Sequence, residues 1–513
     1  MKSHPAINAI VRTERAVVAV ALVATLAAAV GLWRVGLRED YRLEAFVATN
    51  DPSYAQYRAF MDEFTSNEFA LLAIHRDKPF DAGMEAVLAE AARRLATVPA
   101  VAKAGALTDI PALVRGAFGD RLYDHPLLAG NLISTDRKTV AVLCRMAGER
   151  GDGPERRKTV ADMRAIVGEL RAEHPDCTFL LTGPYVTLID MYNYVEHDLV
   201  VFSVLAFALM TVTLGLVFRR WQPMVYCAGV AACAILCTLG LTIAAGIVTS
   251  LVTQMLVVLI IVLAVANCVQ LAVAARESVV ALPEADRVTR YRATLAHMAA
   301  PCAAAIVTTM AGFGSVGVSA IAPVRRFGGL MVFGLAVALI VGFAGVGWLH
   351  CGHAPKRTEH GRLSGWLESV SRWTLAHRRG CMLGFGVLVL AALPGFARLR
   401  FESDFVKNFR PASEVRRSYH FIEQNLSPLG SVEIVVRRRD GGFIASADAV
   451  RTAHALGAEV VARHALVKRA LSLYDLLTLV FPVEPAGDAD VRTRLAALRL
   501  WPSGEGLRRG FLN

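Results

Sequence analysis

The sequence is dominated by hydrophobic runs long enough to cross a membrane. A hydrocarbon core of ~30 Å needs about 20 apolar residues in a helix that rises 1.5 Å per residue. One run covers residues 16–33, five more follow at 199–218, 224–247, 251–275, 298–321 and 327–349, and a shorter seventh covers 381–397. The pattern predicts a polytopic α-helical membrane protein with about seven transmembrane helices. The polar remainder consists of 1–15, 34–198, the connector 350–380, and 398–513.

The basic residues predict how these spans are oriented. If the spans alternate, the N-terminus, the turn after the second span and the connectors after the fourth and sixth lie on one side, and they carry most of the Lys and Arg outside the two large polar regions. The short opposite loops hold only Arg325 and Arg326. By the positive-inside rule, the N-terminus is cytoplasmic and both large polar regions are periplasmic. Much of the net charge of +11 therefore reflects basic residues that orient the spans in the membrane, and no nucleic-acid partner is indicated.

The first span has an alternative interpretation as a cleaved signal peptide. It follows a basic segment, and Ala27-Ala28-Ala29 offers a small-residue cleavage site. The 18-residue run is longer than the usual signal-peptide core, so a membrane anchor is the simpler interpretation. Either way, the region 34–198 lies on the outer side.

The region 34–198 has the pattern of a mixed α/β domain. Apolar runs of strand length occur at 69–75, 139–146 and 178–182, and helical patterns occur at 82–98 and 154–173. Strand–helix–strand units of this size are typical of a ferredoxin-like arrangement.

The region after the seventh span repeats the beginning of this domain. Matches occur at an offset of 359 and, further on, at 366, and residues 432–439 correspond to the strand 69–76. At the offset of 359, Phe46, Val47, Pro52 and Phe60 match Phe405, Val406, Pro411 and Tyr419, in that order. At the offset of 366, Leu107, Asp109, Leu113 and Val114 match Leu473, Asp475, Leu479 and Val480. We therefore expect an internal duplication, a recurring device in transporters, with an incomplete second copy. The sequence leaves open a split gene, a frameshift, a fragment or a natural short form.

Two local motifs and the order of spans carry a resemblance to a known family. The motifs are Ala264-Val-Ala-Asn-Cys-Val-Gln-Leu271 and the series Pro301, Thr308-Thr309, Gly312-Phe313, Pro323 and Gly328. One span is followed by a large outer domain and five clustered spans, and then the same order begins again. The order of these elements resembles the resistance-nodulation-division (RND) superfamily. The likeness is to its MMPL-type and predicted-exporter branches, including hopanoid-type lipid exporters, and 199–349 resembles a sterol-sensing-domain-like core.

The resemblance implies proton-driven efflux of lipids or other hydrophobic or amphiphilic molecules from the bacterial inner membrane. Expected partners are membrane lipids, the cargo, and either further copies of this chain or a separately encoded C-terminal half. The family's proton carrier is usually a fourth-span aspartate, but Asn267 stands at that position and Gln270 at the histidine-like one. None of the second to sixth spans contains Asp, Glu, Lys, Arg or His, so the expected proton relay is absent from this half.

These polar positions form the candidate site. Asn267 and Gln270 share a helix face, and amides at this depth are expected to hydrogen bond within the bundle. Asn267, Gln270, Thr308 and Thr309 are predicted to line a former proton pathway. Small residues at helical spacing favour close helix packing: Pro301, Gly312, Ser315 and Ser319 in the fifth span, and Gly229, Cys233, Gly240 and Ala244 in the third.

The sequence offers little support for other chemistry. No Walker A loop, nucleophile elbow or zincin motif occurs, so we expect neither an enzyme nor a cofactor. His75, His125, His174 and His197 lack metal-ligand spacing, and pairing of Cys144 with Cys177 stays open. The segment 362–379, with Trp366 and Trp373, fits an amphipathic helix on an anionic leaflet. Alternatives to transport are a membrane scaffold, a lipid sensor, or an inactive fragment.

Overall fold

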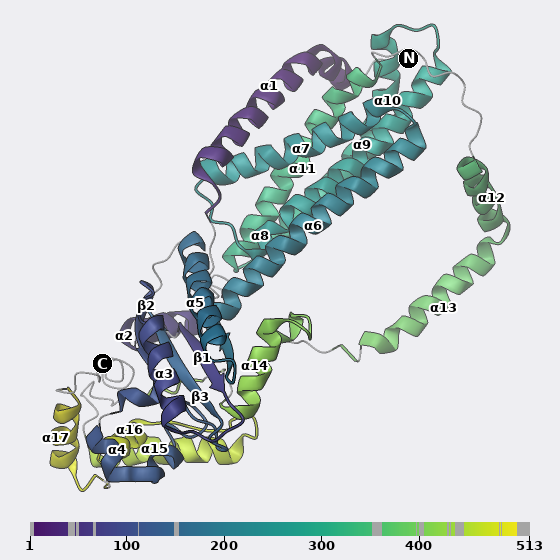
Figure 1. Ribbon diagram of the computed structural model, residues 1–513. Coiled ribbons are helices and arrows are strands. Elements are labelled where there is room, and N and C mark those ends of the chain that lie inside the picture. The colour runs from purple at the N-terminus through teal and green to yellow at the C-terminus, as the bar shows by residue number, and fades with distance from the viewer. Residues whose placement is uncertain are drawn as a thin grey trace. The chain divides into compact units, whose positions relative to one another are not determined.

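The chain forms two compact units, and each draws on two separate parts of the sequence. The computed structural model describes residues 5–38, 47, 51–64, 68–110, 112–147, 153–350, 362–396, 398–399, 405–427, 430, 432–436, 446–481, 483 and 485–499. The helical unit comprises Met1–Arg38 and Glu196–Phe405, and the α/β unit comprises Glu39–Val195 and Val406–Asn513. Figure 1 shows the elements of both.

All seven predicted spans are helical. The helices are α1 (Pro5–Val35), α6 (Pro184–Phe218), α7 (Trp221–Ala244), α8 (Leu251–Gln254), α9 (Leu256–Ala281), α10 (Arg287–Val316), α11 (Ala322–Leu349), α12 (Arg362–Ala376) and α13 (Arg378–Phe396). Among the described residues, seven helices are long and apolar enough to cross a membrane. The predicted span 251–275 differs slightly, because the short α8 precedes α9. Several helices extend past their apolar runs, since polar residues continue a helix beyond the hydrocarbon.

The helical unit is held together by close contacts at small residues. Helices α7, α9, α10 and α11 share one apolar core, and α1 packs mainly against α7 and α11. At Gly334 a side chain has no room, because an added Cβ would lie 2.5 Å from Ile260 Cδ1. At Gly240 it would lie 2.5 Å from Ala28 Cβ. Small residues let helix backbones approach closely where no aqueous hydrophobic effect drives association, as expected for the third span.

The α/β unit is built on one four-stranded sheet. Its strands are β1 (Phe69–His75), β2 (Val101–Gly105), β3 (Thr139–Met146) and β4 (Thr178–Thr182). Their order is β2-β3-β1-β4, and every neighbouring pair is antiparallel. The helix α3 (Ala82–Leu95) follows β1, and α5 (Gly153–Glu173) follows β3. Three strands and both helices lie where the pattern predicts them, whereas β2 was not predicted.

The remaining elements belong to the same unit or lead into it. They are α2 (Pro52–Phe64), η2 (Leu107–Asp109), α4 (Ala112–Phe118), η3 (Gly119–Asp124), η4 (Phe405–Asn408), α14 (Glu414–Asn425), α15 (Ala447–Arg463), α16 (Leu473–Val480) and α17 (Asp488–Arg499).

The two polar regions share one core, although the sequence suggested two separate domains. Ile422 of α14 is fully buried against Leu71 and Ala73 of β1 and Ala141 of β3. These side chains alternate along the strands and so occupy one face of the sheet. The helices α3 and α5 contact β3 and β4 and each other. In Figure 1, α14 and α3 lie on different sides of β1.

The two regions that were matched in the sequence can be compared element by element. The order α2, β1, α3, η2 in the first region parallels α14, residues 432–436, α15 and α16 in the second. Asp109 Oδ2 accepts a hydrogen bond from Ala106 N at 3.1 Å, and Asp475 Oδ2 accepts one from Ser472 N at 2.7 Å. The predicted strand 432–439 is not found at 432–436, and residues 437–439 lie outside the described residues. A strand needs a hydrogen-bonded neighbour, and none pairs with 432–436 in the described chain.

Candidate functional site

The predicted polar positions lie on the adjacent helices α9 and α10. Asn267 on α9 is half-buried, and its Nδ2 donates a hydrogen bond to the Leu263 carbonyl at 3.0 Å. The bond satisfies the expectation of a hydrogen bond within the bundle, and it is made inside one helix. A side chain that bonds the carbonyl one turn back is satisfied locally and needs no partner helix.

Gln270 makes a polar contact between the two helices. Its side chain is exposed, and Oε1 lies 3.6 Å from the Sγ of Cys302 on α10, which donates to it. Since a thiol is a weak donor, most of the hydrogen-bonding capacity of this amide is left for another partner.

The threonines on α10 are also satisfied within their helix. The Thr308 hydroxyl donates to the Ala305 carbonyl at 2.9 Å, and the Thr309 hydroxyl donates to the same carbonyl at 2.8 Å. Thr308 is exposed and Thr309 is half-buried. None of the side chains of Asn267, Gln270, Thr308 and Thr309 titrates, so these four donate and accept hydrogen bonds but do not themselves carry a proton.

The small residues of α10 do not pack as expected. Pro301, Gly312 and Ser315 are exposed, and Ser319 is half-buried. A Cβ added at Gly312 would meet nothing within 4 Å, and the Ser315 hydroxyl donates to the Gly312 carbonyl at 2.7 Å. No helix of the described chain therefore covers this stripe.

A partly buried ion pair at the opposite end of α10 was not predicted from the sequence. Arg287 Nη2 donates to Glu14 Oε1 of α1 at 2.8 Å, and its Nε donates to the Gly347 carbonyl of α11 at 3.0 Å. The other oxygen, Glu14 Oε2, is buried without a hydrogen-bond partner. A Cβ on Gly347 would lie 2.2 Å from that oxygen, so the glycine makes room for the pair. The available signal was an acidic residue just before the first span.

Beside this pair, a buried histidine follows α11. His350 Nε2 lies 3.2 Å from the Thr294 hydroxyl, which is 2.8 Å from the hydroxyl of Ser278. Burial, with help from the positive charges of Arg290 and Arg287, lowers the pKa of His350 to about 4. The imidazole is therefore neutral at physiological pH and serves as a hydrogen-bonding group.

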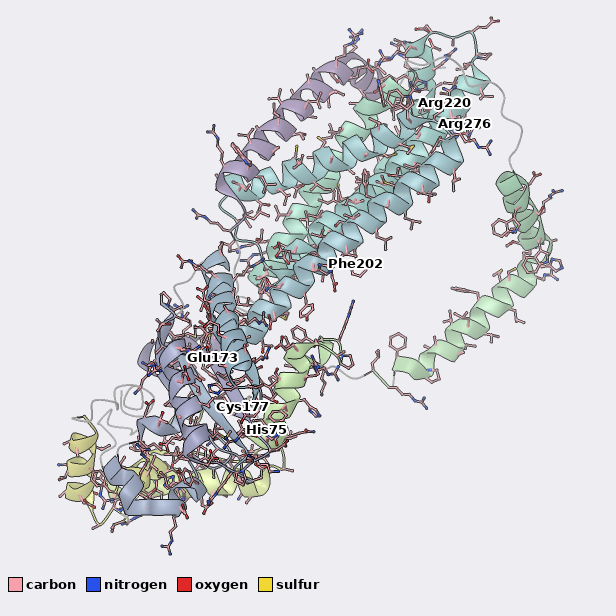
Figure 2. The ribbon with its side chains drawn as sticks, viewed as in Figure 1. His75, Glu173, Cys177, Phe202, Arg220 and Arg276 are labelled. Atoms are coloured by element: carbon pink, nitrogen blue, oxygen red, sulfur yellow. The ribbon has the colours of Figure 1, made fainter. Side chains whose placement is uncertain are left out.

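In the α/β unit, one histidine does join a group with metal-ligand geometry. Ligand atoms of Glu90, Glu173 and His174 lie within 4.8 Å of one another, although the sequence showed no such spacing. Figure 2 labels Glu173 on α5. The Arg94 guanidinium contacts both carboxylates, at 2.9 Å from Glu173 Oε1. Because both carboxylates already pair with Arg94, the arrangement fits an ion-pair cluster.

The possible disulfide is excluded by the sheet register. Both Cys144 and Cys177 are free. Cys144 lies opposite Ala70 at one end of β1, while Cys177 adjoins Thr178, which lies opposite His75 at the other end. Figure 2 shows Cys177 near His75. Five residues along a strand span ~17 Å, far beyond the ~7 Å Cα separation that a disulfide tolerates.

Comparison with known proteins assigns the family. The sequence matches the MMPL family model over residues 53–377, which is more than half of the chain. The chain belongs to the MMPL family. With its seven membrane-length helices, this MMPL protein is a multi-pass membrane protein, and its membership supports the predicted RND-type permease. No curated protein matches the sequence.

Proposed function

We propose that this MMPL protein is an RND-type exporter of lipids or other hydrophobic molecules in the bacterial inner membrane. The observation that carries the proposal is the polar face of α9 and α10, formed by Gln270, Thr308 and Ser315, which is exposed in the described chain. The exposed Gln270 amide, which keeps most of its hydrogen-bonding capacity, is expensive in lipid and therefore favours contact with further helices. An RND-type transporter supplies such helices in its second half.

The α/β unit supports the same proposal. Its sheet order β2-β3-β1-β4, with α3 and α5 as the connecting helices, fits a ferredoxin-like fold. We propose that it is a periplasmic porter domain and that the N-terminus is cytoplasmic. The shared core at Ile422 and the matching turns at Asp109 and Asp475 favour the internal repeat.

Proton coupling would require a group from outside this face. Since Asn267 and Gln270 do not titrate, we propose that the proton-carrying acid belongs to a partner bundle, supplied by a separately encoded half or another copy. Asn267→Asp is expected to add a titratable group without creating transport by the purified chain alone. Proton-coupled transport by that variant alone would contradict this assignment.

The test is lipid movement in proteoliposomes with and without the partner half. A fluorescent phosphatidylglycerol is placed in the membrane, a proton gradient is imposed, and loss of the probe to acceptor vesicles is followed. Gradient-dependent loss is expected only with the partner half, and its absence there refutes export.

A matched pair of variants tests the polar face. Thr308→Val removes a hydroxyl from the face, and Thr213→Val removes one from an exposed position of α6. The first is expected to weaken association with the partner half, measured by co-purification, and the second to leave it unchanged. Equal effects would show that the α9–α10 face is not the contact.

A second function is favoured by the missing acid. A scaffold or lipid sensor needs no proton carrier, and the second to sixth predicted spans contain no ionisable side chain. Saturable lipid binding by the chain alone, with no gradient-dependent transport under any pairing, would support this alternative.

A further inference from the structure

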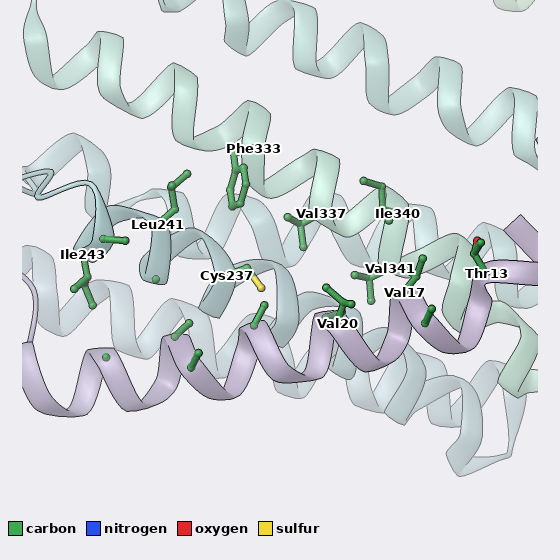
Figure 3. Close-up of a pocket in the computed structure, with 18 residues that line it drawn as sticks. Thr13, Val17, Val20, Cys237, Leu241, Ile243, Phe333, Val337, Ile340 and Val341 are labelled. Carbon is green, nitrogen blue, oxygen red and sulfur yellow. The ribbon is translucent and has the colours of Figure 1, made fainter. Parts of the chain in front are cut away.

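A long apolar groove runs between α1, α7 and α11. Its volume is about 880 Å³, within the range of about 300–1,000 Å³ common for ligand sites. Along α1 its lining extends from Thr13 to Gly31, which at 1.5 Å per residue is ~27 Å, close to the ~30 Å of a hydrocarbon core. Figure 3 shows the lining side chains of the three helices.

The wall of the groove is almost entirely hydrocarbon. On α1 it is lined by small residues such as Ala24 and Ala27, and on α11 by larger ones, Phe333 and Val337. The one hydroxyl in the lining, that of Thr13, donates to the Ala9 carbonyl of its own helix at 2.9 Å. The groove therefore offers dispersion contacts along its length, and the hydroxyl in its lining already has a hydrogen-bond partner.

Two contacts fix α1 beside the groove. Toward its C-terminal end, α1 meets α7 where Ala28 faces Gly240, and the Thr25 hydroxyl donates to Cys233 Sγ at 3.1 Å. Toward its N-terminal end, Glu14 is paired with Arg287 of α10. These contacts hold α1 against the rest of the helical unit near both ends of the groove.

Basic residues mark one end of the groove. Arg12 and Arg15 flank the lining residues Thr13 and Ala16, and both arginines are exposed. No acidic side chain within the described ranges forms an ion pair with either. Positive charge at the end of a hydrocarbon-lined groove complements a lipid whose chain is apolar and whose headgroup is anionic.

We propose that this groove binds an acyl chain of an anionic phospholipid, with the headgroup held near Arg12 and Arg15. A chain that leaves the bilayer for the groove gains little from the hydrophobic effect, because both surroundings are apolar. The gain comes from fitting a preformed wall and from charge at the headgroup. Each arginine near a lipid surface favours an anionic headgroup by about fivefold, so the anionic lipid is selected over a neutral lipid with the same chains.

The proposal is tested by binding of spin-labelled lipids to the full chain in a neutral detergent. The probe is phosphatidylglycerol with a nitroxide on its acyl chain, and phosphatidylcholine with the same chains is the neutral arm. The wild-type protein is expected to immobilise phosphatidylglycerol at least tenfold more tightly. Equal affinities would overturn the headgroup assignment.

Matched variants locate the binding site. Ala24→Phe fills the groove from α1, and Ala19→Phe places the same ring at an exposed position of α1 outside the lining. The first is expected to lose at least tenfold in affinity, and the second to stay within twofold. Val337→Phe fills the groove from the opposite wall and is expected to lower lipid affinity in the same way. It tests the site even if Ala24→Phe misfolds. Equal binding by the filled and control proteins would refute the site.

Two further outcomes separate the alternatives. Arg12→Gln combined with Arg15→Gln is expected to reduce phosphatidylglycerol binding to the phosphatidylcholine level, and unchanged preference would refute the role of these arginines. If Ala24→Phe instead breaks a dimer without affecting lipid binding, the groove holds a second copy and the proposal is wrong. The assay needs no proton gradient and no partner half, so its result is independent of the transport experiment.

Discussion

Replacing Ile422 with alanine tests whether the two polar regions fold around one core. The side chain is 0% exposed and packs against Leu71, Ala73 and Ala141 from the first region. The change removes three carbon groups, worth about 0.8 kcal/mol each. With the cavity left behind, the expected loss of unfolding free energy is about 2–5 kcal/mol.

The assay is native-state hydrogen exchange of the strand amides. If β1 opens together with the core that Ile422 completes, its most protected amides should exchange roughly 30-fold to a few thousand-fold faster, because about 1.4 kcal/mol corresponds to a factor of ten. Ile434→Ala is the matched control, since Ile434 is 55% exposed; it is expected to change exchange by about twofold. Faster exchange in α14 alone, with β1 unchanged, would refute the shared core.

Three further predictions address packing, pH and charge. Gly334→Ala is expected to lower the thermal midpoint in detergent by the equivalent of about 1–3 kcal/mol, because its Cβ would meet Ile260. Gly312→Ala is the control, since its Cβ would lie in open space. Equal shifts of the midpoint in the two variants would contradict the packing at Gly334. Burial lowers the pKa of His125 below 6.5, so the unfolded chain binds more protons in acid and the α/β unit loses stability as pH falls below 6.5. Urea titrations at several pH values should show that His125→Asn weakens the dependence of the unfolding free energy on pH, while the same replacement at exposed His464 should not. An unchanged pH dependence in His125→Asn would count against a neutral buried imidazole. Glu14→Gln, which leaves Arg287 with a weaker partner, should destabilise the helical unit by about 1–3 kcal/mol, and an unaltered midpoint would show that the pair contributes nothing.

The membrane architecture was the most predictable part of the protein. Twenty consecutive apolar residues determine a spanning helix almost regardless of context, because an unpaired backbone is too costly in lipid. The strands 69–75, 139–146 and 178–182 were also predictable, since each is a compact apolar run. Strand β2, Val101–Gly105, was not, because its sequence Val-Ala-Lys-Ala-Gly lacks a strong strand pattern. It exists through its pairing with β3.

The candidate site shows the limits of local patterns. Spacing placed Asn267 and Gln270 on one helix, and both lie on α9 as expected. Spacing did not reveal that the Asn267 amide bonds its own helix or that the Gly312 stripe is uncovered. Similar small-residue stripes on α7 and α10 have different surroundings: a Cβ added at Gly240 of α7 would meet Ala28, whereas one added at Gly312 of α10 would lie in open space.

The sequence by itself determined the number of spans, the main strands and the absence of an acid from the second to sixth spans, because these depend on residue type and local periodicity. Tertiary structure alone decided which distant segments share a core, as with Ile422 and β1, and where α1 leaves a groove beside α7 and α11. It also excluded the Cys144–Cys177 bond through strand register. The physical reason is that burial and close packing depend on contacts between residues far apart in sequence, which no local pattern records.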